Sequence, residues 1–300
     1  MRFPRLKDLR VRLSSARLLG NLIKNSITFK LKRKALRRFR ATDFETIIVD
    51  MDGTLFRTDA NLEALSICYP EIVDGKIAGE EIYDSLIKKI ASGEYSIEKA
   101  IIEGNKFLMA RKMRKQDFYK VFDKVKPLIR KPLVRALSQI KSNGKQVVLA
   151  TLSSKDFAEI VGSYLKSKFG FEFDCICGTE LNFDEAGFIV GIKSIVGTKD
   201  FELEGIKVMS KLSVIKESLQ AKGLNFDQKK AVIITDSYGD IDVAKSIVTI
   251  LIRQHNPSMA QKVSYKLGLA DYLFPDNKDL ETNLVSLILG SEKPLGIEEV

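Results

Sequence analysis

The chain has 300 residues, 45% hydrophobic and 29% charged, which suits one large or two ordinary globular domains and excludes a disordered chain. Its three cysteines argue against a disulfide framework, and its single histidine, His255, excludes any mechanism or metal site that needs two, so proton transfer falls mostly to carboxylates. The net charge of +10 arises at the N-terminus, because residues 1–40 hold 14 Lys and Arg against one acid, whereas the other 260 residues hold 35 basic and 38 acidic residues.

Residues 1–42 read as a basic amphipathic extension. Apolar residues at mixed three- and four-residue spacings predict one or two helices within 8–40, with apolar stripes between basic faces. Such a segment can lie on an anionic membrane, so we expect a cytoplasmic protein that contacts a membrane surface through residues 1–40. A solvated arm, a helix packed on its own domain and a cleaved import sequence remain alternatives. Nucleic-acid binding ranks lower, because no aromatic residues are regularly interleaved among the arm's charges.

Beyond residue 43, short runs rich in β-branched and apolar residues alternate with helical patterns. The patterns at 155–168 and 211–222 are helical, and residues 181–193 form a hairpin signal around Asp184-Glu185-Ala186-Gly187. Strands that alternate with helices predict an α/β fold, a Rossmann-like parallel sheet flanked by helices. The predicted buried strands are 46–49, 146–151, 174–178, 231–236 and 247–253.

Between residues 59 and 140 the strand signal disappears. This segment is predicted to be an all-helical cap inserted after the first strand, and residues 43–58 and 141–290 form the core. The predicted cap helices are 60–67, 80–91, 97–109 and 116–125.

Four aspartates lie at or just beyond the carboxyl ends of predicted strands, at the sheet edge where open α/β sheets place their ligands. They are Asp50, Asp52, Asp236 and Asp240. If the strands before Asp50 and Asp236 are neighbours, their carboxylates converge, which is unfavourable unless a cation lies between them. Oxygen ligands with room for water suit Mg²⁺ better than Zn²⁺.

Other residues at this edge suit a phosphate, which usually shares a Mg²⁺ site. Thr151 ends a strand, Gly53 and Thr54 follow the first strand, and Lys211 opens a helix after a capping Ser210. One aspartate can then attack phosphorus, and a second, two residues on, can serve as acid and base. Ser153 and Ser154, in the predicted loop after Thr151, contact phosphate or cap the next helix.

The run Asp50-Met51-Asp52-Gly53-Thr54-Leu55-Phe56 resembles the signature of the haloacid dehalogenase superfamily of phosphatases and phosphotransferases. Its later motifs follow in order as Thr151, Lys211 and the acidic stretch 236–240, over about residues 44–275. The stretches 149–154, 178–181 and 253–267 resemble the phosphoserine phosphatase-like branch, which carries a helical cap.

The resemblance implies a Mg²⁺-dependent phosphatase that hydrolyses a small phosphomonoester through an aspartyl-phosphate. A phosphotransferase, or an inactive scaffold that acts through its basic arm, remains open, as do the substrate and the oligomeric state. Lys207 is the alternative to Lys211. The implied roles are nucleophile and metal ligand for Asp50, acid/base and backbone-carbonyl ligand for Asp52, metal ligand for Asp236, water-mediated metal contact for Asp240, and phosphoryl binding for Gly53, Thr151 and Lys211.

Overall fold

The computed structural model describes residues 44–236, 247–254, 270–290 and 298–299. The predicted basic extension, Asp240, His255 and most of the stretch 253–267 lie outside these residues. None of the helices in the described part of the chain is long and apolar enough to cross a membrane.

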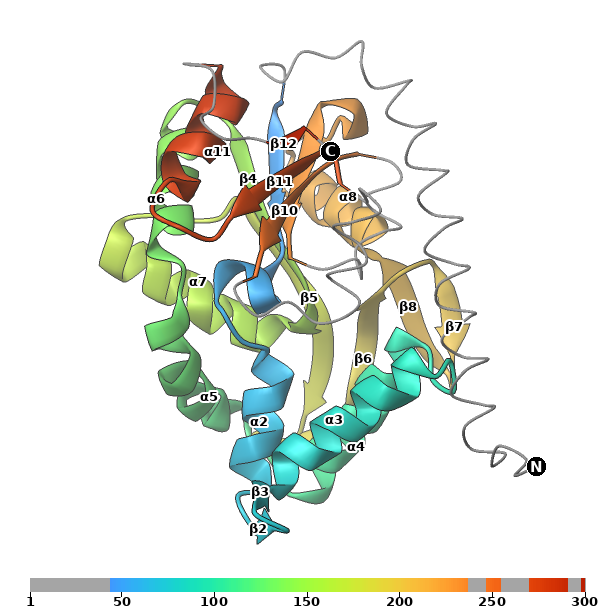
Figure 1. Cartoon of the computed structure of the whole chain (residues 1–300). Coiled ribbons are helices and arrows are strands. Elements are labelled where there is room, and N and C mark those ends of the chain that lie inside the picture. Colours follow the sequence, from blue (N-terminus) through green and yellow to red (C-terminus); the bar gives the residue numbers. More distant parts are fainter. Residues whose placement is uncertain (1–43, 237–246, 255–269, 291–297, 300) are drawn as a thin grey trace, which may run out of the picture.

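A ten-stranded sheet runs through the molecule in the order β12-β11-β10-β9-β1-β4-β5-β6-β8-β7 (Figure 1). Pairing is parallel from β11 to β5, whereas β6 runs antiparallel to β5. The predicted parallel sheet is therefore confirmed for its centre, and antiparallel strands extend it at both edges. The strands of this sheet are β1 (Thr46–Val49), β4 (Gln146–Ser154), β5 (Cys175–Phe183), β6 (Ile189–Gly197), β7 (Phe201–Leu203), β8 (Ile206–Ser210), β9 (Ala231–Thr235), β10 (Val248–Arg253), β11 (Tyr272–Pro275) and β12 (Glu298–Glu299).

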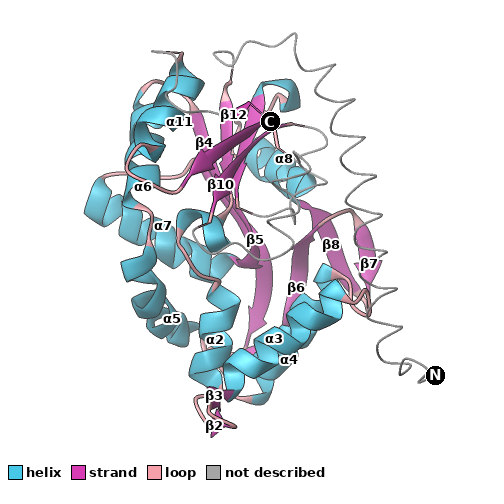
Figure 2. Ribbon diagram, viewed as in Figure 1, coloured by secondary structure: helices cyan, strands magenta, loops and turns pink. Residues whose placement is uncertain are grey.

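Helices cover both faces of the parallel region (Figure 2). Alternate residues of β1 enter two cores, since Ile47 and Val49 join the cluster that includes residues of α6 (Lys131–Ser142), α7 (Lys155–Phe169) and α11 (Leu280–Leu289). Ile48 joins the opposite cluster, with Ile215 and Leu219 of α8 (Lys211–Ala221). Burial on both faces explains why Ile47, Ile48 and Val49 are apolar in succession rather than alternating with polar residues.

The insertion after β1 contains α2 (Ala60–Cys68), α3 (Ala78–Ala91), α4 (Ile97–Ala110) and α5 (Phe118–Val125). The expectation that it is entirely helical is wrong in one detail, because β2 (Ile72–Val73) and β3 (Lys76–Ile77) form a short hairpin. Its turn is Asp74-Gly75, and both residues have positive φ, 49° and 79°. An Asp-Gly pair is a favoured two-residue hairpin turn, so the signal was present in the sequence. The helix α6, most of which falls in the range 59–140 predicted for the cap, packs against α11 and β4.

The antiparallel extension of the sheet supports the insertion. Ile102 of α4 packs against Ile195 of β6 and Val208 of β8. The carboxylate of Glu98, whose residue is 2% exposed, accepts hydrogen bonds from the backbone N–H and the hydroxyl of Thr198, at 2.9 and 2.7 Å. The cap helix α4 is therefore tethered to the antiparallel part of the sheet, at the end of β6.

Two strands run beyond their predicted ends. β4 continues three residues past Thr151, so Ser153 and Ser154 lie in a strand and not in a loop. β5 continues to Phe183 and pairs with β6, which confirms the predicted hairpin and lengthens it. Its turn is closed by the Gly187 N–H, which donates to the Asp184 carbonyl at 2.9 Å.

Candidate active site

The loop after β1 carries the first two predicted site residues. Asp50 follows the strand directly, and Met51–Leu55 forms one wide helical turn, in which Asp52 is extended and Gly53 is left-handed with φ 68°. β1 pairs in parallel with β9 on one side and β4 on the other. The predicted neighbourhood of the strands is confirmed, and it brings Asp236 and Thr151 to the same edge as Asp50.

Asp50 lies against a lysine and a threonine. The Lys211 ammonium is 2.8 Å from Asp50 Oδ1, and the Thr54 hydroxyl is 3.3 Å from Asp50 Oδ2. The same hydroxyl is 3.3 Å from Asp236 Oδ1, so the two carboxylates converge on one side chain. All four residues are buried. Of the two candidate lysines, Lys211 lies beside Asp50, whereas Lys207 is exposed on β8.

Asp52 is held by three donors. Its Oδ1 accepts from the Ala60 N–H at 2.7 Å, and its Oδ2 accepts from the hydroxyls of Thr151 and Ser153 at 3.0 and 2.7 Å. Burial raises the pKa of Asp52 to about 7, the nearby charge of Asp59 adds to the rise, and the three hydrogen bonds oppose it. The protonated carboxyl is therefore well populated near neutral pH. Thr151, predicted to bind phosphate, here orients Asp52.

Gly53 is required by space as well as by backbone conformation. A Cβ atom at this position would lie 2.2 Å from Asp236 Oδ2, far inside van der Waals contact. Its positive φ also disfavours any residue with a side chain. The glycine thus lets the loop approach the Asp236 carboxylate closely.

Behind the loop lies a charged group that the sequence analysis missed, which we call the arginine cluster: the buried Arg130 and Asp276 and the exposed Arg57. Arg130 is fully buried and donates from Nε to Asp276 Oδ2 at 2.9 Å. Its Nη1 donates to the backbone carbonyls of Gly53, Thr54 and Phe56. Arg57 binds the same carboxylate through two hydrogen bonds, at 2.8 and 2.9 Å. The cluster therefore fixes the backbone of the loop that carries Asp52.

Opposing effects act on the Asp276 carboxyl. Burial raises its pKa, but the hydrogen bonds and charges of Arg57 and Arg130 outweigh burial and lower it below its usual range. No local pattern marks this cluster, because Arg130 and Asp276 are 146 positions apart and meet only in the folded chain.

The oxygen donors at the mouth of the sheet suit a hard divalent cation. Asp50 and Asp236 are buried acids that both lie 3.3 Å from the Thr54 hydroxyl. Lys211 contacts Asp50. No three His, Cys, Asp or Glu side chains gather into a metal-binding group within the part of the chain that the structure describes. Asp240, the remaining predicted carboxylate, lies outside that part, so the evidence for a cation site rests on Asp50 and Asp236.

A mostly parallel sheet with an aspartate pair after its central strand and an inserted cap defines a class of α/β hydrolases. The family model described as haloacid dehalogenase-like hydrolase matches residues 47–245, and the chain belongs to this family. No curated protein matches the chain.

Solved structures share the fold at low sequence identity. A phosphoserine phosphohydrolase-like protein from Francisella tularensis subsp. tularensis SCHU S4 is 17% identical, with a TM-score of 0.56 over 81% of this chain and 100% of that one. A HAD family hydrolase from Salmonella enterica subsp. enterica serovar Typhi is 13% identical, with a TM-score of 0.58 over 83% and 72%. A phospho-aspartyl intermediate analogue of phosphoserine phosphatase is 15% identical, with a TM-score of 0.54 over 80% and 97%.

Proposed function

We propose that the protein is a Mg²⁺-dependent phosphatase that hydrolyses a phosphomonoester through an aspartyl-phosphate on Asp50. The observation that carries this proposal is the buried Asp50 carboxylate, held 2.8 Å from the Lys211 ammonium, with Asp52 two residues further along the same loop. The Asp50 carboxylate is held by the Lys211 ammonium, whereas the Asp52 carboxyl accepts hydrogen bonds from two hydroxyls. This difference suits a nucleophile at Asp50 and an acid and base at Asp52.

In this mechanism, Asp50 attacks phosphorus and the bond to the alcohol oxygen breaks. Asp52 gives its proton to that oxygen, and later takes a proton from the water that cleaves the aspartyl-phosphate. Lys211 holds the Asp50 carboxylate and offsets phosphoryl charge. Thr151 keeps Asp52 oriented through their 3.0 Å hydrogen bond. Gly53 has no side chain that would collide with the Asp236 carboxylate.

A magnesium ion would be held by Asp50, the backbone carbonyl of Asp52 and Asp236, with Asp240 acting on it through water. When bound, it supplies positive charge that offsets the phosphoryl oxygens and the converging carboxylates.

Replacing the nucleophile tests the proposal directly. Asp50→Asn should abolish phosphate release from a small monoester with Mg²⁺ present, because the amide cannot form the acyl-phosphate, and the circular dichroism spectrum should stay unchanged. Asp123→Asn, an exposed position on α5, is the matched control and should keep wild-type turnover. Turnover in Asp50→Asn equal to that of the control would overturn the mechanism.

The charge of residues 1–42 supports a second, separate proposal, that this segment contacts an anionic membrane surface from the cytoplasm. The full chain should sediment with anionic vesicles, whereas a chain without residues 1–40 should stay in the supernatant. Equal retention of both would remove this role.

A further inference from the structure

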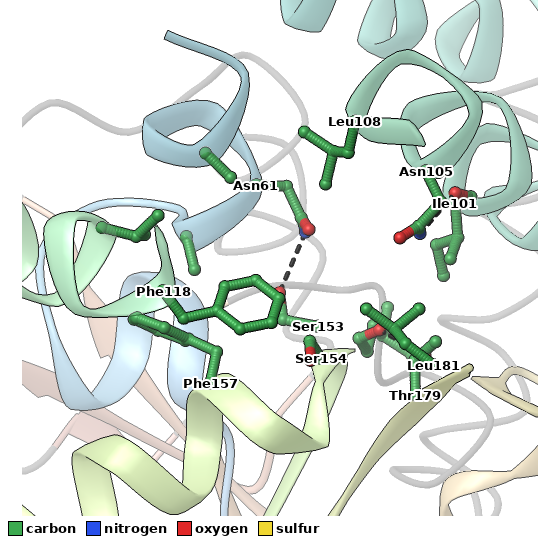
Figure 3. Close-up of a pocket in the computed structure, with 14 residues that line it drawn as sticks. Asn61, Ile101, Asn105, Leu108, Phe118, Ser153, Ser154, Phe157, Thr179 and Leu181 are labelled. Carbon is green, nitrogen blue, oxygen red and sulfur yellow. Dashed lines mark hydrogen bonds between the residues drawn. The ribbon is translucent and has the colours of Figure 1, made fainter. Parts of the chain in front are cut away.

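Two of the acids at the site are held by side chains that are themselves held. The Ser153 hydroxyl donates to Asp52 at 2.7 Å and accepts from the Asn61 side chain at 2.9 Å, on the wall of a small pocket below the cap (Figure 3). The bond from Asn61 keeps the hydrogen of Ser153 directed at the acid. Asp236 has a comparable support, which begins at Gln254.

Gln254 lies at the same edge of the sheet as the predicted site residues. It directly follows β10, which pairs in parallel with β9, the strand that ends just before Asp236. The carboxyl ends of neighbouring parallel strands meet at one edge, so a side chain after β10 can reach the residue after β9. Gln254 is half-buried there, and its amide lies between Arg130 and Asp236.

The hydrogen bonds of the Gln254 amide fix which way it faces. Arg130 Nη2 donates to Gln254 Oε1 at 2.8 Å, and a guanidinium has donors only, so the amide oxygen must point to it. The amide nitrogen then donates to the Gly53 carbonyl and to Asp236 Oδ2, the latter at 3.2 Å. A carbonyl and a carboxylate only accept, so a flipped amide would set oxygen against oxygen at both. The amide is therefore held in one orientation.

Through Gln254, the arginine cluster reaches a carboxylate that faces the candidate cation site. Arg130 is itself fixed by Asp276, at 2.9 Å, and by backbone carbonyls of the loop. The other oxygen of Asp236 lies 3.3 Å from the Thr54 hydroxyl. The hydroxyl and the amide are neutral, so they orient the carboxylate without cancelling its charge. Losing such a support of a metal ligand lowers metal affinity or activity about 10- to 100-fold.

We propose that Gln254 is a positioning residue, which holds Asp236 in the orientation that receives the divalent cation. This inference rests on the proposed function, which assigns Asp236 to Mg²⁺. Other groups hold the two reacting acids, since Lys211 contacts Asp50, and two hydroxyls and a backbone N–H contact Asp52. Loss of the Gln254 amide therefore weakens cation binding more than it slows the reaction at saturating Mg²⁺.

Gln254→Met tests this role, because methionine has a similar length and no amide. Titration calorimetry of the full chain with Mg²⁺ alone, without substrate, measures cation binding. The Mg²⁺ dissociation constant should be about 10- to 100-fold higher than in wild type. At saturating Mg²⁺, kcat for p-nitrophenyl phosphate should fall less than about 3-fold, because the reacting acids keep their own partners.

Gln139→Met is the matched control. Gln139 is exposed on α6, and its amide also donates to a carboxylate, that of Glu281, at 2.8 Å. This variant should keep the wild-type Mg²⁺ dissociation constant and the wild-type kcat. Equal Mg²⁺ dissociation constants in the two variants, whatever their unfolding midpoints, would give Gln254 a structural role alone. That result would overturn the inference and leave the phosphatase proposal standing.

A second variant covers a failure of Gln254→Met to fold. Gln254→Asn keeps an amide but is one methylene too short to span Arg130 and Asp236, so it should show the same rise in the Mg²⁺ dissociation constant. Wild-type chain that binds Mg²⁺ but releases no phosphate from any monoester would refute the phosphatase proposal, and the calorimetry would still decide the role of Gln254. Wild-type chain that binds no Mg²⁺ would overturn both.

Discussion

Charged side chains lie on both sides of the loop that follows β1, and the two sides differ. Behind the loop, Arg130 and Arg57 share Asp276, and backbone carbonyls take further donors of Arg130. In front of it, Asp50 and Asp236 converge on Thr54, and Lys211 contacts Asp50. Side chains behind the loop are saturated by fixed partners, which is the arrangement of a structural support. Carboxylates outnumber lysines in front, which is the arrangement of a site that receives a cation and a phosphate.

The largest expected effect follows from breaking the arginine cluster. Arg130→Met should lower the free energy of unfolding by about 3–5 kcal/mol, because it removes one of the two cations bound to the buried Asp276 carboxylate and leaves several buried backbone carbonyls without that donor. Arg135→Met is the matched control, since Arg135 is half exposed and pairs with Glu281 at the surface. A surface pair contributes less than about 1 kcal/mol. Equal denaturant midpoints for the two variants would show that the cluster does not support the loop.

Low pH should weaken the contribution of Asp276 to stability. The pKa of Asp276 is lower in the folded protein than its ordinary value of 3.8, so its contribution to stability is fully present above that value and is lost as the pH falls through the folded pKa. Asp276→Asn should therefore be less stable than wild type at pH 7, and the difference should shrink below about pH 3.8. Urea unfolding at a series of pH values measures this. A difference that stays constant down to the lowest pH would contradict the pairing.

In front of the loop, a change of charge should affect turnover. Lys211→Met should reduce kcat/KM by about 100- to 1000-fold, the usual cost of one lost electrostatic contact at a reacting group. Lys207→Met removes an exposed lysine four residues earlier and should leave turnover near wild type. Phosphate-release kinetics for both variants decide between the two lysines, and a larger loss in Lys207→Met would reverse the assignment.

The loop itself lies between the two sides. A substitution in it, at Gly53, should have the smallest effect on stability. Gly53→Ala and Gly144→Ala both place a side chain at positive φ, 68° and 79°, at a cost of about 1–2 kcal/mol each. Only at Gly53 would the new Cβ atom also meet Asp236, because nothing lies within 4 Å of the corresponding atom at Gly144. Gly53→Ala alone should lose phosphate release. Full activity in Gly53→Ala would show that the approach to Asp236 is not needed.

The central strands could be predicted because both of their faces are buried. Continuous runs of β-branched and apolar residues such as 46–49 and 231–235 are typical of strands that are buried on both faces. By contrast, β8 reads Ile-Lys-Val-Met-Ser and is partly exposed, and it is a strand because β6 and β7 pair with it. β11 was likewise missed, since its four residues are too few to show a period.

The front of the site could also be predicted, because its residues follow strands at fixed positions. Asp50, Asp52 and Asp236 needed only the strand assignments and the assumption that the strands are neighbours. Arg130 could not be found this way, since an arginine before a Lys-Pro pair resembles any solvated residue at a helix start. Arg130 can be buried because it pairs with Asp276, which lies 146 residues further along the chain.

The tether between Glu98 and Thr198 has a consequence for how molecules enter. Separating α4 from β6 would uncover a carboxylate that is 2% exposed and break both of its hydrogen bonds. The insertion is thus fastened at its distal end as well as through its chain connections to the sheet. With α4 held against the sheet, the insertion cannot open at this end without breaking these contacts.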